Sequence, residues 1–156
     1  MNVPVEKPNT DIPVLVVYSP QTPEIERKAI QQSLVFNLRD QYGIVSHAPE
    51  LRNEKHSLYD WITEHHERAH AVLCVCNRYF YEEWNTEANP ETNPSVVYLF
   101  KSLFKGNIHS NKYAVVLTDV ADNVYVPPHL KHRQKYMIDD CEGITRFARD
   151  LCRFTA

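Results

Sequence analysis

The segment that decides the fold runs from Pro13 to Pro20 and reads PVLVVYSP. Residues 14 to 17 are all apolar and lack the polar alternation of a half-exposed strand, which favours a strand covered on both faces in a parallel sheet. The β-branched side chains, the shortness of the run and the proline at each end argue against a buried helix. A buried strand is therefore predicted here, and the chain turns sharply where the strand ends.

A long helix is predicted to follow this strand. Thr22 offers a hydroxyl cap, Pro23 suits the first helical position, and Glu24 places negative charge at the positive end of the helix dipole. The helix should end near Gly43. Its predicted inner face has a spacing close to 3.6 residues and consists of Ile25, Ala29, Ile30, Leu34 and Leu38.

The rest of the chain continues to alternate between strand and helix patterns. Short apolar runs predict strands at 43–46, 70–76, 113–118 and 136–138. Helices are predicted over 79–84 and 96–104 and near both 58–65 and 139–154, with apolar faces that include Leu58, Trp61, Ile62 and His65 in the second helix and Ile144, Phe147, Leu151 and Phe154 in the last. Expected caps are Ser57, Asn93 with Pro94, and Asp139. This order predicts an α/β three-layer sandwich, in which a central five-stranded parallel sheet carries helices on both faces.

Composition and charge set limits on the class of protein. The chain has 156 residues, 43% of them hydrophobic and 24% charged, which is typical of one globular domain, expected over residues 13–156 after a flexible leader at 1–12. A net charge of −3 gives no whole-domain attraction to nucleic acid or membrane. The apolar runs are far shorter than the ~20 residues of a membrane span, and no secretory signal pattern opens the chain. Four cysteines, which include Cys74 and Cys76 in one strand, are interpreted as reduced thiols of a cytoplasmic protein.

Residues 66 to 70, with the sequence HERAH, match the zinc-protease pattern H-E-x-x-H. In that pattern two histidines one helical turn apart bind zinc, and the glutamate activates a water molecule. The pattern must lie inside one helix, but His70 opens a run with the composition of a buried strand. The two imidazoles should therefore not share a face, so a solvated helix end is expected and a zinc hydrolase is kept as an alternative.

Nucleophilic catalysis by Ser19, Cys74 or Cys76 is a further alternative. A serine at the carboxyl end of a parallel strand lies where ligands usually bind, but Tyr18 and Pro20 replace the small residues that a nucleophile elbow requires. The chain has three glycines, none near another, so no glycine-rich phosphate loop is present. The basic residues Lys131, His132, Arg133 and Lys135 are interpreted as a solvated loop, with contact to an acidic partner surface or headgroup as the alternative. We therefore expect no catalytic residue, no cofactor and no metal.

Four segments together resemble the SEFIR domain, the TIR-like module of interleukin-17 receptors and their cytosolic adaptor. They are VLVVYS at 14–19, the long helix that ends at YGI (42–44), LYDWI at 58–62, and AHAVLCVCNRY at 69–79. The first is similar to box 1 of the family and the last to box 2, and the likeness extends from about Pro13 to Phe154. The family usually has an acidic residue and an aromatic residue after the second strand, where this chain has HAPEL at 47–51.

The resemblance implies a flavodoxin-like sheet and homotypic SEFIR–SEFIR association in signalling towards NF-κB. It also implies a cytoplasmic location, as a free adaptor or as the cytoplasmic part of a receptor. On the net charge alone, we expect no contact with nucleic acid. The faces that the family uses correspond to 79–84, the loop at 85–93 and the exposed side of the helix at 95–105. The predicted protein-binding residues on these segments are Tyr79, Tyr81, Glu82, Glu83, Trp84, Glu87, Glu91 and Lys101.

Residues 79–88 support two further interpretations. Tyr79, Phe80, Tyr81 and Trp84 form an aromatic cluster of the kind that anchors interfaces, although some of these rings could simply cover the sheet. Some TIR domains hydrolyse NAD with a glutamate four residues after a tryptophan. Here Ala88 occupies that position and Glu87 lies one residue short, so a TIR-like NAD hydrolase remains an alternative to the interaction module.

Overall fold

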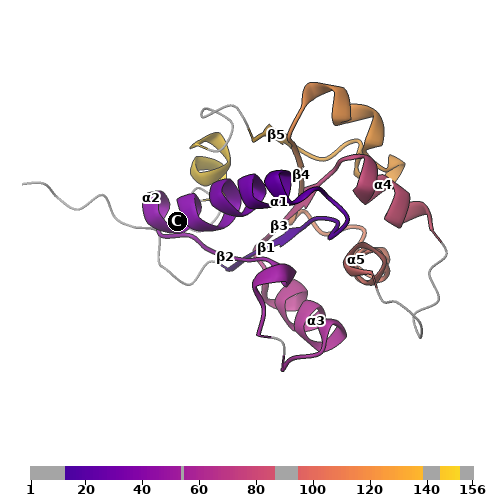
Figure 1. Ribbon diagram of the computed structural model, residues 1–156, viewed down its shortest axis with the longest axis horizontal. Coiled ribbons are helices and arrows are strands. Elements are labelled where there is room, and N and C mark those ends of the chain that lie inside the picture. The colour runs from indigo at the N-terminus through magenta and orange to yellow at the C-terminus, as the bar shows by residue number, and fades with distance from the viewer. Residues whose placement is uncertain (1–12, 54, 87–94, 139–144, 152–156) are drawn as a thin grey trace, which may run out of the picture.

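A computed structural model of the protein describes residues 13–53, 55–86, 95–138 and 145–151. Its centre is a five-stranded parallel sheet with the strand order β2-β1-β3-β4-β5 (Figure 1). The strands are β1 (Pro13–Val17), β2 (Val45–His47), β3 (Ala71–Val75), β4 (Tyr113–Leu117) and β5 (Lys135–Met137). This order is that of flavodoxin-like folds, so the predicted fold class is confirmed.

The helices lie in two layers. One layer is a continuous helical segment made of α1 (Glu24–Gln31), a π-helical turn (Gln32–Phe36) and α2 (Asn37–Tyr42), together with the helical residues 145–151. Their apolar side chains share a core cluster with one face of the sheet. Three helices, α3 (Leu58–Arg68), α4 (Arg78–Asn85) and α5 (Val96–Lys105), cover the other face (Figure 1). Short 3-10 turns occupy Pro49–Leu51, Val120–Tyr125 (η3) and Pro128–Leu130.

The two-sided burial predicted for β1 is confirmed. Val14 and Val16 join the core cluster under α1, and Leu15 and Val17 join the cluster under α3 and α5. All four are at most 1% exposed. Because full burial of such a side chain is worth roughly 1.5–3 kcal/mol, this single strand contributes to both halves of the core.

The first helix differs from its prediction at its start. Thr22 does not cap it, because Pro23 occupies the cap position without a side-chain hydrogen bond. Ile25 is 84% exposed, and Ala29 is also exposed, so both were wrongly assigned to the inner face. Ile25 precedes the buried Ile30 by five residues, which turns it about 140° away around the helix. The helix ends as predicted at Gly43, whose φ of 68° is the left-handed conformation that favours glycine.

The other helix caps and faces differ in detail. The Ser57 hydroxyl accepts a hydrogen bond from the Asp60 backbone N–H and caps α3 as predicted. Ser95 caps α5, whereas the expected Asn93 and Pro94 lie outside the described residues, as do Asp139, Ile144, Phe154 and the leader 1–12. In α3 it is His66, not the predicted His65, that is buried. Phe147 and Leu151 of the last helix are buried, as their stripe predicted.

Candidate interaction surface

Helix α4 has an inner face that belongs to the core. The side chain of Asn77 accepts a hydrogen bond from the Phe80 backbone N–H at 2.9 Å and so begins the helix. Phe80 and Trp84, one helical turn apart, are 0% and 3% exposed. The predicted contact residue Trp84 is therefore wrong as a surface anchor, since its ring packs between Phe80 and Phe104.

The outer face of α4 carries Tyr79, Tyr81 and Glu82. The two tyrosines are half-buried and Glu82 is exposed. Arg78 lies over the Tyr79 ring at 4.9 Å and pairs with Glu82 at 3.7 Å. The helix therefore presents aromatic rings beside a solvent-screened ion pair, a combination that is common in protein interfaces.

Two other predicted contact residues connect α4 to α5. The Ser95 hydroxyl donates a hydrogen bond to Glu83, and the Lys101 ammonium donates to the Trp84 carbonyl at 2.6 Å, near the end of α4. Glu83 and Lys101 thus have roles in joining the two helices. Glu87 and Glu91 lie outside the described residues, and so does Ala88 of the alternative NAD site.

The sequence did not predict that η3 continues the outer face of α4. The Tyr81 and Tyr125 rings lie 6.1 Å apart, and Val120 and Val124 of η3 are 72% and 73% exposed. The available sequence signal was a pair of valines four residues apart among the polar residues Asp119, Asp122 and Asn123. We call Tyr79, Tyr81, Glu82, Val120 and Val124 the α4–η3 surface.

The carboxyl ends of β1 and β3, where ligands of this fold class usually bind, are occupied by the chain itself. Ser19 is fully buried, and its hydroxyl accepts a hydrogen bond from the Gln21 backbone N–H at 3.1 Å. Asn77 donates to the Thr22 hydroxyl at 3.2 Å and joins the two strand ends. Ser19 is a turn residue, as the sequence suggested, and the position offers no exposed nucleophile.

A polar cluster at the same end of the sheet fixes the loop after β2. Gln31 donates hydrogen bonds to the Tyr18 hydroxyl at 2.9 Å and to Glu50 at 2.5 Å, and Arg27 pairs with Glu50 at 2.8 Å. Burial raises the pKa of Tyr18 to about 12, so the phenol stays protonated. Glu50, the acidic residue in the loop that departs from the family pattern, is thus engaged within the chain.

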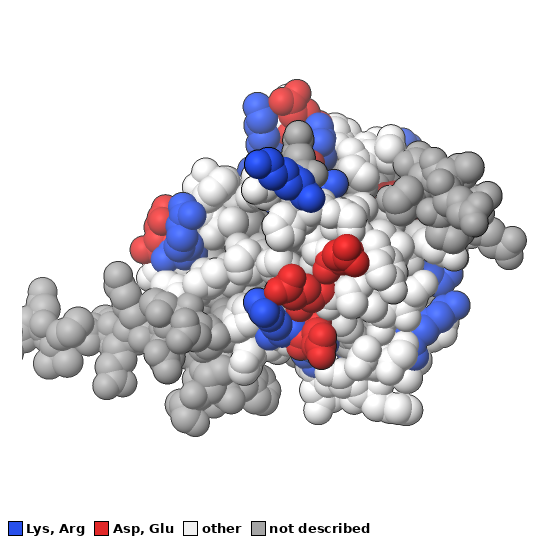
Figure 2. All heavy atoms as spheres, turned by 90° about the horizontal axis from the view of Figure 1, so that it is seen from below, with Lys and Arg blue, Asp and Glu red and all other residues white. Residues whose placement is uncertain are grey.

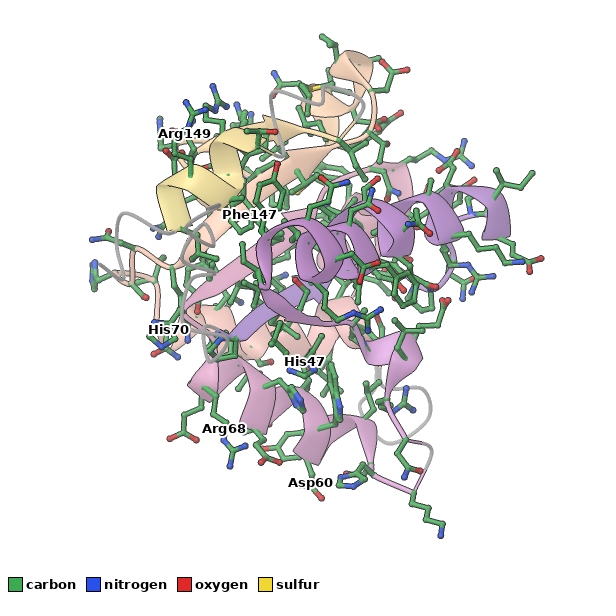
Figure 3. All side chains as sticks on the ribbon, turned by 90° about the vertical axis from the view of Figure 1, so that its left-hand side faces the viewer. His47, Asp60, Arg68, His70, Phe147 and Arg149 are labelled. Atoms are coloured by element: carbon green, nitrogen blue, oxygen red, sulfur yellow. The ribbon has the colours of Figure 1, made fainter. Side chains whose placement is uncertain are left out.

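The two histidines of the HERAH segment lie in different environments. His66 is 3% exposed, and its Nε2 atom lies 2.6 Å from the Tyr113 hydroxyl, so the expected solvated helix end is wrong at this residue. Burial, with a smaller effect from Lys112, lowers the pKa of His66 to about 4. His70 is exposed beyond the end of α3, at the start of β3 (Figure 3). The pair therefore lacks the shared helical face that the zinc pattern requires.

The described residues also include two cysteines and several side chains of the kinds that bind metals. Cys74 and Cys76 are free and buried, and burial raises the pKa of both thiols, which opposes formation of a reactive thiolate. No group of three or more metal-ligating side chains occurs in these ranges. Most of the described residues on the face in Figure 2 are uncharged, and the acidic and basic side chains there lie in small scattered groups. None of the described helices is long and apolar enough to cross a membrane.

The parallel sheet of order β2-β1-β3-β4-β5 defines a flavodoxin-like α/β protein whose usual ligand position is filled by its own side chains. A scan against protein-family models matches residues 12–151 to the SEFIR domain, so the chain belongs to the SEFIR domain family. It is a signalling interaction module. A search of the curated proteins found no match.

Proposed function

We propose that this domain mediates homotypic SEFIR–SEFIR association in interleukin-17-type receptor signalling towards NF-κB. It acts in the cytoplasm, either as an adaptor or as the cytoplasmic part of a receptor, and its partners are SEFIR domains, with self-association included. The α4–η3 surface is the observation that carries this proposal, because it combines exposed valines, half-buried tyrosines and an exposed acidic residue on two elements in contact.

The composition of this surface supports a protein partner. Val120 and Val124 leave nearly three quarters of their area in water, at 72% and 73% exposure. Covering such side chains stabilises a complex by about 25 cal/mol per Å² of apolar area removed from water. Glu82 is exposed on α4, which contacts η3, and gives the surface a charge that a basic partner can recognise. Interfaces commonly combine such an apolar centre with a charged rim.

We also propose that the domain is not an enzyme. Support comes from the burial of Ser19 and of both described thiols, and from the separation of His66 from His70. Incubation of the purified domain with NAD, and separately with zinc followed by metal analysis, tests this. NAD turnover, or one tightly held zinc per chain, would contradict it.

The test of the interaction surface is a binding measurement with purified SEFIR domains of interleukin-17 receptors. Glu82→Lys and Val124→Asp should each weaken association about tenfold. The first reverses the charge that a basic partner would recognise, and the second places a carboxylate in the apolar part of the α4–η3 surface. Glu64→Lys is the matched control: Glu64 pairs with Arg68 four residues on, and Glu82 pairs with Arg78 four residues back. Both pairs are exposed, so neither change should unfold the domain.

The possible results distinguish the proposed binding surface from the proposed homotypic function. Loss of binding in the α4–η3 variants and not in Glu64→Lys supports both the surface and the function. Binding that survives every α4–η3 change overturns the proposed face. Failure of the unaltered domain to bind itself or any receptor SEFIR domain overturns the proposed homotypic function.

A further inference from the structure

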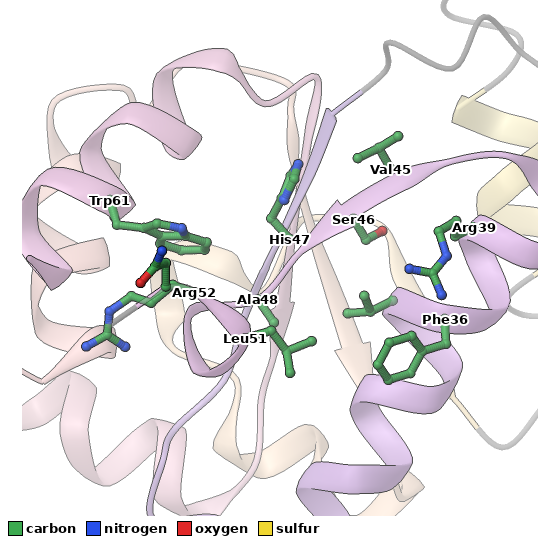
Figure 4. A pocket seen from close by; sticks show the side chains of 11 residues that line it. Phe36, Arg39, Val45, Ser46, His47, Ala48, Leu51, Arg52 and Trp61 are labelled. Carbon is green, nitrogen blue, oxygen red and sulfur yellow. The ribbon is translucent and has the colours of Figure 1, made fainter. Parts of the chain in front are cut away.

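A hollow of about 460 Å³ surrounds the free edge of the sheet at β2 (Figure 4). Strand β2 has β1 as its only neighbour within the described residues, so its outer edge is unpaired. The hollow extends around that edge. Phe36 and Arg39 border it on the α2 side, and Trp61 and Arg52 border it on the α3 side (Figure 4).

Successive side chains of β2 point alternately to the α2 side and the α3 side of the hollow. Ser46 lies opposite Val14 of β1, whose side chain belongs to the core cluster under α1. His47 is the next residue along the strand and therefore points to the other face, where its ring lies 4.7 Å from that of His65 in α3. An added strand would have the same alternation, and its side chains would enter the two halves of the hollow in turn.

Two polar atoms that border the hollow lack partners. Ser46 is 8% exposed, and its hydroxyl is buried without a hydrogen-bond partner among the described residues. The Nε atom of Arg52 is likewise buried and unpaired, although another nitrogen of the same guanidinium donates to the Pro49 carbonyl at 3.0 Å. Buried polar groups usually have partners, so these two atoms indicate a position where a ligand can supply acceptors.

The charge of the hollow specifies that ligand. Arg39 and Arg52 are its charged residues, and no described acidic side chain lines it. The Arg39 Nε atom lies 3.4 Å from Asp40, a long and exposed contact that leaves the guanidinium able to bind a second carboxylate. Apolar surface from Phe36 and the 47% exposed Leu51 lies between the two cations.

We propose that the free edge of β2 accepts an extended acidic segment of a partner protein as a sixth strand. Backbone hydrogen bonds to β2 would hold the segment, as in other cases of strand addition. One acidic side chain would accept from Arg52 on the α3 side, and another would approach Arg39 and Ser46 on the α2 side. An apolar side chain would cover Phe36 or Leu51.

This surface is separate from the α4–η3 surface. Strand β2 forms one edge of the sheet, whereas η3 follows β4 towards the opposite edge. A segment bound at β2 would leave α4 free, so the domain could hold a SEFIR partner and an extended segment at the same time. The inference therefore goes beyond the proposed homotypic association and does not depend on it.

The experiment uses a library of short synthetic peptides that alternate Asp or Glu with Val, Ile, Leu or Phe, and a second library in which Lys replaces the acidic positions. Binding to the isotope-labelled domain is followed by amide NMR shifts and by hydrogen exchange. Acidic peptides should shift and protect the amides of residues 45–47 at submillimolar concentration, and basic peptides should not.

Two arginine variants test the charge requirement. Arg52→Glu and Arg39→Glu should each weaken the best acidic peptide about tenfold or more, as expected from loss of a charge-assisted hydrogen bond. Arg68→Glu is the control, because Arg68 is exposed on α3, pairs with Glu64 and does not line the hollow. Val124→Asp should leave peptide binding unchanged. A thermal unfolding curve for each variant verifies that it is folded.

Several results would overturn the inference. It would fail if no member of the acidic library bound, or if acidic and basic peptides bound equally well. Binding without protection of the amides of residues 45–47 would indicate simple anion binding. Protection of the same amides without peptide, as the domain concentration rises, would assign the edge to a second copy of this chain.

Discussion

Two sets of buried polar side chains differ in how their hydrogen-bonding capacity is used. Between β1 and β3, Asn77 uses both its oxygen and its nitrogen, on Phe80 and Thr22. At β2, the hydroxyl of Ser46 and the Nε of Arg52 have no partner in the described structure. The first position is where ligands of this fold class usually bind, yet here it serves stability. The second is the better candidate for recognition because its polar groups remain available.

His66 is another buried polar side chain that has a partner, because it shares a hydrogen bond with Tyr113 in the core. A neutral imidazole satisfies this site, whereas a proton on it would be buried beside the Lys112 ammonium. Partnered groups should therefore control stability, and unpartnered groups should affect binding with little effect on stability. Three predictions test that division.

The largest effect is expected from acid. The pKa of His66 is lowered to about 4 in the folded protein, below the ordinary value of 6.5. The unfolded chain therefore binds a proton more readily, so stability is complete above pH ~6.5 and decreases as the pH falls towards 4. The loss should approach 3 kcal/mol. Urea unfolding between pH 7 and pH 4 measures it.

The control for this prediction is His66→Gln, which can still form a hydrogen bond with Tyr113 but cannot titrate. Its unfolding free energy should vary less with pH across the same range. A variant with the same pH dependence as the unaltered protein would assign the effect to other groups, such as His47, whose pKa is also lowered by burial.

A smaller loss is expected from Asn77→Ala. This change removes the cap of α4 and the bond to Thr22, which together should cost about 2 kcal/mol in the free energy of unfolding. Asn77→Ser should recover part of the loss, since a serine hydroxyl can still cap the helix. Ser57→Ala is the comparison at an exposed cap, with an expected cost of about 1 kcal/mol. Equal effects at the two caps would contradict a special role for the Thr22 contact.

The smallest effect is expected from Ser46→Ala. The Ser46 hydroxyl has no partner to lose among the described residues, so its removal should change the unfolding free energy by less than about 0.5 kcal/mol or stabilise the fold slightly. Chemical denaturation of the two proteins in parallel is the measurement. A loss comparable to that of Asn77→Ala would mean that Ser46 is satisfied in solution, and the contrast between the two positions would disappear.

Much of the fold could be predicted because its signals are local. The apolar run at 14–17, the glycine after the first helix and the serine before the second act through nearby backbone, and all three correspond to observed elements. Errors arose where a neighbour in space decides the outcome. Ile25 fits an apolar spacing but extends into solvent, and Thr22 contacts Asn77, which is 55 residues away in the chain.

The candidate surface was only partly predictable for the same reason. An aromatic cluster at 79–84 can be found by reading the sequence, but its division into buried Phe80 and Trp84 and partly exposed Tyr79 and Tyr81 depends on the sheet beneath. The contribution of η3 could not be inferred, because 3-10 turns leave little periodic signal in a sequence.

The sequence alone determined the class of fold, its family resemblance and the absence of a glycine-rich phosphate loop, because strand, helix and turn preferences act over a few residues. Only the tertiary structure decided which side chains remain available to a partner. Availability depends on contacts between distant segments: Asn77 with Thr22, His66 with Tyr113, and, within the described part of the chain, the lack of any such contact for the Ser46 hydroxyl. No local pattern records whether such a contact is made.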